Sequence, residues 1–184
     1  MLRLFAAIFI PDDITDRVVA MQRGLGGANW RPRENLHVTL CFYGDVAEPD
    51  ADELDLALDE LARARSGFEL QLKGSGFFGK SEPHTLYLGL AENAALRALA
   101  ADCERAGRRL GLKLDTRKFT PHLTIAYLAG ADLGRVMEFE QSHALFASRA
   151  WRVEEFGLFS SQTRKAAPSL YRLEAAYALD RTNP

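Results

Sequence analysis

The chain has 184 residues, of which 47% are hydrophobic, enough for one compact domain with a substantial core. Its 23 basic and 25 acidic residues give a net charge of −2 at pH 7, which excludes a protein that coats nucleic acid by neutralising many phosphates. Two cysteines, Cys41 and Cys103, make neither a disulfide framework nor a CxxC metal knuckle, which indicates a reducing, intracellular compartment.

The first half of the chain predicts alternating strands and helices. The apolar run 2–10 is too short for a signal peptide or a membrane span, so we expect a first strand and a soluble, cytoplasmic protein. Proline and two acidic residues then begin a predicted helix over 11–25. The next predicted elements are a strand over 36–44, an acidic helix from Pro49 to Ala64 and a strand over 67–79.

The second half repeats this order. Its best helix spans 91–112, with apolar residues along one side and Gly111 at its end. The other predicted elements are strands over 84–90, 122–128, 151–160 and 169–179 and a helix over 131–146. The repeated order predicts a diverged duplication: one domain over 1–184, with pseudo-symmetric lobes of roughly 1–80 and 81–184 and a groove between them.

A His-x-Thr-x motif occurs once in each half, at 37–40 and 122–125. In a strand the side chains of His37 and Thr39 point to one face, about 7 Å apart, while the residues between them face the core. The same holds for His122 and Thr124. Two such strands facing each other would gather two imidazoles and two hydroxyls in one site.

Two imidazoles beside a cleft are suited to acid–base chemistry, because an unperturbed histidine titrates at about pH 6.5. One ring can take a proton from an attacking water or hydroxyl, and the other can give a proton to a leaving oxygen. Threonine hydroxyls can donate to phosphate oxygens, where charge accumulates. These groups fit phosphodiester hydrolysis by in-line displacement, without a covalent intermediate and without a metal or other cofactor.

The other two histidines lack such a context. His84 follows a proline at a predicted strand start, and His143 lies in a weakly patterned polar stretch, so both are interpreted as surface or structural residues. A single His-x-Thr in a strand is itself usually a packed histidine beside a β-favouring threonine. The functional interpretation depends on the pair.

At these motifs the sequence resembles the 2H phosphoesterase superfamily, and within it the RNA 2',3'-cyclic phosphodiesterases, also called 2'-5' RNA ligases. The likeness covers essentially the whole chain and includes the segments "RLFAAIFIP", "ENLHVTL", "GFFGKSEPHTLYLGL", "RKFTPHLTI" and "LFSSQ".

The resemblance implies a bilobed α+β fold with an antiparallel sheet in each lobe. It also implies hydrolysis of an RNA terminal 2',3'-cyclic phosphate to a 2'-phosphomonoester. It assigns His37 as the acid and His122 as the base, with Thr39 and Thr124 on the phosphate. The expected partners are RNA 3' ends or nucleotides with a 2',3'-cyclic phosphate. No membrane and no obligate protein partner is implied, and we expect a monomer.

Two positions depart from many relatives: Cys41 and Tyr127 stand where those proteins often carry basic residues. Arg117 and Lys118, before the second motif, could supply positive charge instead, as could Arg33 before the first. Aromatic side chains could stack a terminal base. The candidates are Phe77, Phe78, Tyr127 and Tyr171.

Two alternatives stay open at this point. The same chemistry in reverse would join RNA ends through a 2'-5' linkage without ATP, and the sequence does not separate the two directions. A non-catalytic module that binds RNA ends would keep the same fold, and the changes at Cys41 and Tyr127 leave room for it.

Overall fold

A computed structural model describes residues 1–115, 117–165 and 167–180. The described helices are α1 (Asp12–Met21), α2 (Glu48–Arg63), α3 (Ala94–Arg109) and α4 (Leu133–His143), with a short 3-10 helix η1 (Arg33–Asn35). The described strands are β1 (Leu2–Phe9), β2 (Ala28–Trp30), β3 (His37–Val46), β4 (Phe68–Leu70), β5 (Leu72–Phe78), β6 (Thr85–Leu90), β7 (His122–Leu128), β8 (Trp151–Val153), β9 (Glu155–Arg164) and β10 (Ala167–Ala178).

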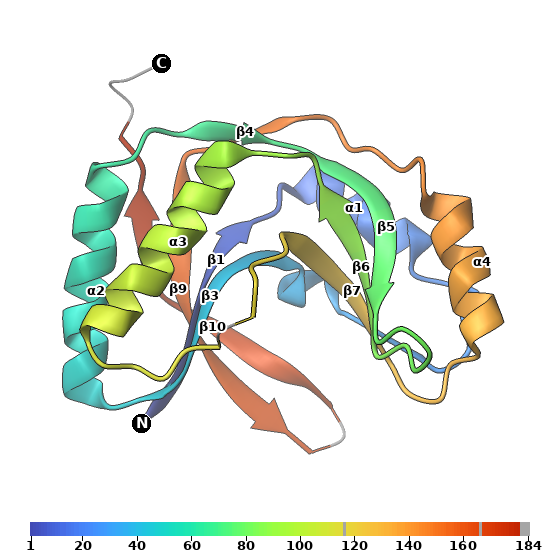
Figure 1. Cartoon of the computed structure of the whole chain (residues 1–184), viewed down its shortest axis with the longest axis horizontal. Coiled ribbons are helices and arrows are strands. Elements are labelled where there is room, and N and C mark those ends of the chain that lie inside the picture. The colour runs from blue at the N-terminus through green and yellow to red at the C-terminus, as the bar shows by residue number, and fades with distance from the viewer. Residues whose placement is uncertain (116, 166, 181–184) are drawn as a thin grey trace.

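One large antiparallel sheet runs through the molecule in the order β10-β9-β1-β3-β7-β6-β5, with β2 also paired to β7 (Figure 1). Strands β4 and β8 form a separate two-stranded sheet. The predicted α+β class with antiparallel strands is therefore confirmed. The division into pseudo-symmetric lobes stays a prediction, and the strand order interleaves the two sequence halves, because β9 and β10 lie beside β1 while β5 lies beyond β6.

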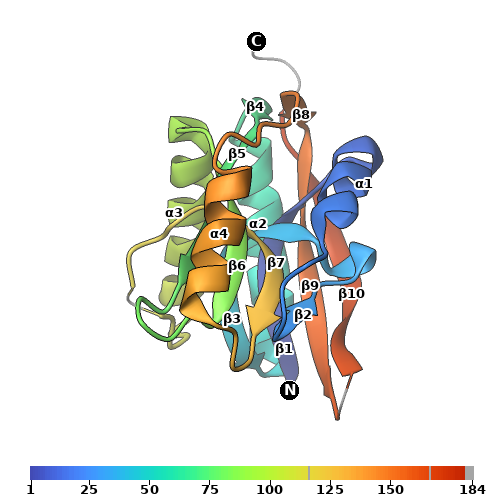
Figure 2. The same ribbon diagram turned by 90° about the vertical axis from the view of Figure 1, so that its right-hand side faces the viewer.

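The helices cover two separate parts of this sheet. Helices α2 and α3 pack together and against β3 and β10, whereas α4 packs against β5 at the far side (Figures 1 and 2). Helix α3 begins at Asn93, whose side chain accepts the backbone N–H of Leu96, and its buried face includes Leu96, Leu99 and Cys103. Each helix thus buries an apolar stripe that its sequence spacing predicts.

Most predicted elements are present, with three differences. The segment 67–79, expected as one strand, is divided into β4 and β5, and the segment 151–160 is divided into β8 and β9. The first strand of each divided segment, β4 or β8, pairs with the other in the separate small sheet. Phe68 pairs with Val153, and Leu70 pairs with Trp151. Strand β2 was not predicted. Its three residues pair with the end of β7.

No helix in the described part of the chain is long and apolar enough to cross a membrane.

Candidate active site

The two motif strands, β3 and β7, are neighbours in the sheet and are joined by one residue pair, Val38 with Leu123. Both of these side chains are fully buried. Because side chains alternate along a strand, the residues on either side of this pair point to the opposite face. These residues are His37, Thr39, His122 and Thr124, so the structure brings both imidazoles and both threonines to one face of the sheet.

Each motif has a β-bulge at its fourth and last residue. Along β3, Thr39 pairs with Ala7 and Cys41 pairs with Ala6, so Leu40 has no partner of its own. Along β7 the same happens at Ile125, between Thr124 and Ala126. The first seven residues of the two strands also share one burial pattern. The likeness between the motifs therefore extends to an irregularity of the backbone.

The bulges change which side chains reach the site face. Simple alternation would put Cys41 on the face of His37 and Thr39, but Cys41 is buried and Phe42 is 42% exposed. Tyr127, at the matching place in β7, is 47% exposed. Burial raises the pKa of the Cys41 thiol to about 12, so this thiol is not a nucleophile. Cys41 still forms part of the cavity wall.

The His37 ring is held in one orientation and one tautomer. Its Nδ1 lies 2.9 Å from the backbone oxygen of Asn35, and because a carbonyl can only accept, Nδ1 donates. The neutral ring therefore keeps its lone pair on Nε2. The ring packs against Phe5, with centroids 5.0 Å apart, and against Tyr171 at 5.3 Å. Asn35 is itself buried and donates to the backbone oxygen of Ser169 in β10, which fixes the carbonyl that orients His37.

The second histidine repeats this arrangement. Nδ1 of His122 donates to the backbone oxygen of Thr120, two residues earlier, over 2.7 Å. The ring packs against Phe78 at 5.0 Å and Tyr87 at 5.5 Å between centroids. Each imidazole thus has its Nδ1–H used by the backbone, an edge contact with a tyrosine, and its Nε2 available for chemistry.

Both imidazoles are held neutral by their surroundings. Burial lowers the pKa of His37 from its usual 6.5 to about 4; the bond to Asn35 opposes this, and the charges of Arg31 and His122 add to it. Burial also lowers the pKa of His122, against the opposing bond to Thr120. That the charge of His122 acts on His37 indicates that the two rings share one electrostatic environment.

A cavity of about 710 Å³ adjoins the motifs. Its wall includes Thr39, His122 and Thr124, and four residues named by sequence reasoning as binding candidates: Phe78, Arg117, Lys118 and Tyr127. His84 also lies in this wall, with Nδ1 2.9 Å from the hydroxyl of Thr85. Thr39 represents the first motif in this wall, and His37 lies two residues before it on the same face of β3.

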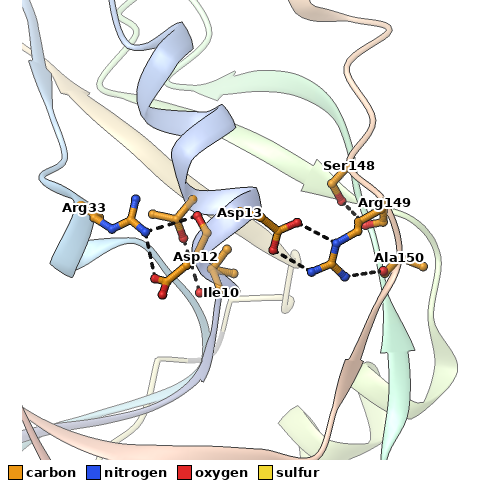
Figure 3. Close-up of polar contacts among 8 residues, drawn as sticks. Ile10, Asp12, Asp13, Arg33, Ser148, Arg149 and Ala150 are labelled. Carbon is orange, nitrogen blue, oxygen red and sulfur yellow. Dashed lines mark hydrogen bonds and ion pairs between the residues drawn. The ribbon is translucent and has the colours of Figure 1, made fainter.

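The remaining candidates are divided between the site and the scaffold. Tyr171 contacts His37, whereas Phe77 packs against the hydrophobic core. Arg33 forms ion pairs with Asp12 (Figure 3) and with Asp16, both in α1, so its charge is compensated within the protein. Arg117 is paired with Asp115 but remains largely exposed at the cavity.

One residue of the site was not found from the sequence. Arg31 lies between the rings of Tyr127 and Tyr171, with its guanidinium carbon 5.1 and 5.8 Å from their centroids. Its Nη2 donates to the hydroxyl of Tyr171 over 3.2 Å. The basic pair Arg31 and Arg33 was visible in the sequence, but only the fold shows which of the two faces the histidines.

Among the described residues, no group of three or more histidine, cysteine, aspartate or glutamate side chains is arranged to hold a metal ion.

The sequence profile of the 2'-5' RNA ligase superfamily matches residues 10–165. The chain belongs to this superfamily. The resemblance inferred from the two motifs is therefore confirmed, and the strands and helices that carry the motifs all lie within the matched region.

Two curated relatives carry the name RNA 2',3'-cyclic phosphodiesterase. The chain is 28% identical to the protein of Aquifex aeolicus over 151 residues, which is 80% of each protein. It is 40% identical to the protein of Geobacillus stearothermophilus over 98 residues, which is 53% of this chain but only 31% of that protein. The fold resembles that of LigT from E. coli, solved with 3'-AMP, with a TM-score of 0.78, 23% identity and coverage of 98% and 99% of the two chains.

Proposed function

We propose that the protein is an RNA 2',3'-cyclic 3'-phosphodiesterase, which opens a terminal cyclic phosphate to leave a 2'-phosphomonoester. The observation that carries the proposal is the matched state of the two imidazoles. His37 and His122 each use Nδ1–H on a backbone carbonyl two residues earlier and keep Nε2 free, beside a threonine on the same sheet face. The names of the curated relatives support the same activity.

In this reaction His122 acts as the base. Its Nε2 takes a proton from water as the water oxygen attacks phosphorus, and the new P–O bond forms opposite the 3' oxygen. A lowered pKa keeps this ring neutral and able to accept a proton at pH 7. Fixing the ring through Thr120 holds Nε2 in place for this transfer.

His37 acts as the acid and gives a proton to the 3' oxygen as the P–O3' bond breaks. Its pKa of about 4 means that it must gain its proton when the anionic substrate binds. A phosphate next to the ring favours the charged form and raises the pKa. After turnover His122 carries a proton and His37 is neutral, and exchange of protons with water restores the starting state.

The hydroxyls of Thr39 and Thr124 donate to the non-bridging oxygens, where charge grows in the transition state. Phe78 and Tyr127 supply aromatic faces for the terminal base, and Arg117 and Lys118 supply positive charge for the RNA backbone. The proposal includes a cytoplasmic monomer that acts on RNA 3' ends or nucleotides without a cofactor or a membrane.

The test is incubation with a short RNA that ends in a 2',3'-cyclic phosphate, with phosphorus NMR to identify which ester bond breaks. We expect a 2'-phosphate product, undiminished in excess EDTA. His37→Ala and His122→Ala should each lower turnover about 10²- to 10⁴-fold, as for loss of a general acid or base. Thr39→Ala and Thr124→Ala should cost about 10-fold.

His143→Ala is the matched control, because this ring stacks on Phe139 in α4, away from the motifs, and its loss should leave turnover within twofold. Full activity in either motif-histidine variant would overturn the assignment. A 2'-5' joined product from two RNA ends would favour the ligation alternative. Tight binding of the cyclic-phosphate RNA without turnover would favour the non-catalytic module.

A further inference from the structure

Arg31 is a buried cation that lacks an acidic partner. The residue is only 7% exposed, and no carboxylate of the described residues forms an ion pair with it. Buried charges in proteins are normally paired, because removing a charge from water is costly. Arg33, two residues later, shows the usual arrangement with its two aspartates. The charge of Arg31 is therefore available to pair with an anion that comes from outside the protein.

The protein holds Arg31 in a fixed place. Its backbone N–H donates to the oxygen of Ile125, the bulge residue of β7, and its own backbone oxygen accepts from the side chain of Gln22. Its guanidinium lies between the rings of Tyr127 and Tyr171 and bonds to the Tyr171 hydroxyl. Such stacking limits rotation of the guanidinium while leaving its N–H edge open.

The unused N–H groups of Arg31 are not fully enclosed. A guanidinium has five N–H donors, and Arg31 uses one on Tyr171. Within the described part of the chain, the only buried side-chain polar atom without a partner is Nε1 of Trp151. The remaining nitrogens of Arg31 therefore keep some contact with solvent, although the residue is only 7% exposed.

The open charge is close to the reacting groups. Tyr171, which bonds Arg31, also contacts the His37 ring, and Tyr127 forms part of the cavity wall with His122 and Thr124. The positive charge of Arg31 is one of the causes that lower the pKa of His37. A ligand that neutralised this charge would therefore raise the pKa of His37.

We propose that Arg31 binds the phosphate of the substrate and that Tyr127 and Tyr171 hold its guanidinium in position for it. The proposal rests on the proposed function for the identity of the substrate. Two N–H groups of one guanidinium match two oxygens of a phosphate. The bound phosphate also cancels the charge that disfavours protonation of His37, so that binding and charging of the acid are coupled through Arg31.

The first measurement is the affinity for inorganic phosphate at pH 7.5, by titration calorimetry, because it does not depend on turnover. Arg31→Gln should weaken binding about 10- to 100-fold, as expected for a charged hydrogen bond. Arg31→Lys keeps the charge but has neither the paired N–H groups nor the stacking of a guanidinium, so it should recover only part of the affinity. Arg149→Gln is the control, since it removes the same charge from an arginine that is paired with Asp13 away from the cavity (Figure 3). It should stay within twofold of the wild type.

The second measurement is kinetic, with the RNA that ends in a 2',3'-cyclic phosphate. Arg31→Gln should raise KM about 10- to 100-fold. It should also move the alkaline limb of the kcat pH profile, where the acid His37 loses its proton, to higher pH, because His37 loses a neighbouring positive charge. Arg149→Gln should change neither quantity. The shift of the limb separates a charge effect from a loss of packing, which would not move it.

The outcomes separate this proposal from the proposed function. If the wild type binds phosphate through Arg31 but does not open the cyclic phosphate, the phosphodiesterase assignment fails and the phosphate site stands. If the wild type opens the cyclic phosphate while Arg31→Gln keeps normal phosphate affinity and KM, the role of Arg31 is overturned.

Discussion

The low pKa of His37 predicts that the protein loses stability in mild acid. In the folded protein the pKa is about 4, whereas an unfolded chain titrates near 6.5. Below pH 6.5 the unfolded state therefore binds a proton that the folded state refuses, so the free energy of unfolding falls as the pH falls from about 6.5 to 4. A full shift from 6.5 to about 4, at about 1.4 kcal/mol per pH unit, amounts to roughly 3 kcal/mol.

At pH 5.0 about 2 kcal/mol of this loss should be present, because pH 5.0 lies about 1.5 units below the unfolded value. The assay is urea unfolding of the wild type and His37→Asn at pH 7.5 and 5.0. The variant cannot gain this proton. The wild type should therefore lose about 2 kcal/mol more than the variant between the two pH values, whatever their difference at pH 7.5.

Ile8→Val is the control for loss of packing. This buried residue lies opposite Val38, and the substitution should cost about 1 kcal/mol at both pH values, since no titrating group is removed. NMR titration of the His37 ring gives the midpoint directly. A midpoint at or above pH 6, or an equal pH dependence in the wild type and His37→Asn, would refute the argument from burial.

Three further predictions follow from the surroundings of the motifs. Asn35→Ala removes the side-chain bond to Ser169 and so frees the residue 35 carbonyl that orients His37. It should lower kcat about 10-fold or more with a smaller change in KM, and should lower the free energy of urea unfolding by about 1–3 kcal/mol. An unchanged kcat would contradict this. Burial raises the pKa of Cys41 and of Cys103, so iodoacetamide at pH 8 should modify neither thiol in the native protein and both in urea, and rapid native labelling would contradict it. In Gly107→Ala the new Cβ would lie 2.9 Å from the buried Tyr43 ring, and urea unfolding should show a loss of about 1–3 kcal/mol; equal or higher stability would mean that the ring can move.

The motif strands were predictable from the sequence because their information is local. The run from His122 to Ile125 alternates polar and apolar residues, and β7 has the predicted bounds. Helix α3 begins three residues later than predicted, at its Asn93 cap, and ends at Arg109. A periodic apolar face and a capping side chain depend only on residues close together in the sequence, so both can be predicted without knowing the fold.

The features that were missed all depend on residues far apart in the chain. A bulge is defined by the pairing of two strands, so neither Leu40 nor Ile125 differs from its neighbours in the sequence. Arg31 differs from Arg33 only through Tyr171, 140 residues later, and through the aspartates of α1. The interleaving of the two halves likewise arises because β9 and β10 return to pair beside β1. Sequence patterns showed which groups could do chemistry, and tertiary pairing decided which of them meet.

The paired bulges decide which side chain reaches the rim of the site. Leu40 and Cys41 are consecutive in β3, and both face the core because the bulge adds one residue on that side. Phe42 therefore points outward again, where strict alternation would have turned it inward. Ile125 gives β7 the same step before Tyr127. Deleting either bulge residue would remove one core side chain and leave the facing of every later one unchanged, whereas inserting a residue into a regular part of either strand would turn the later side chains over.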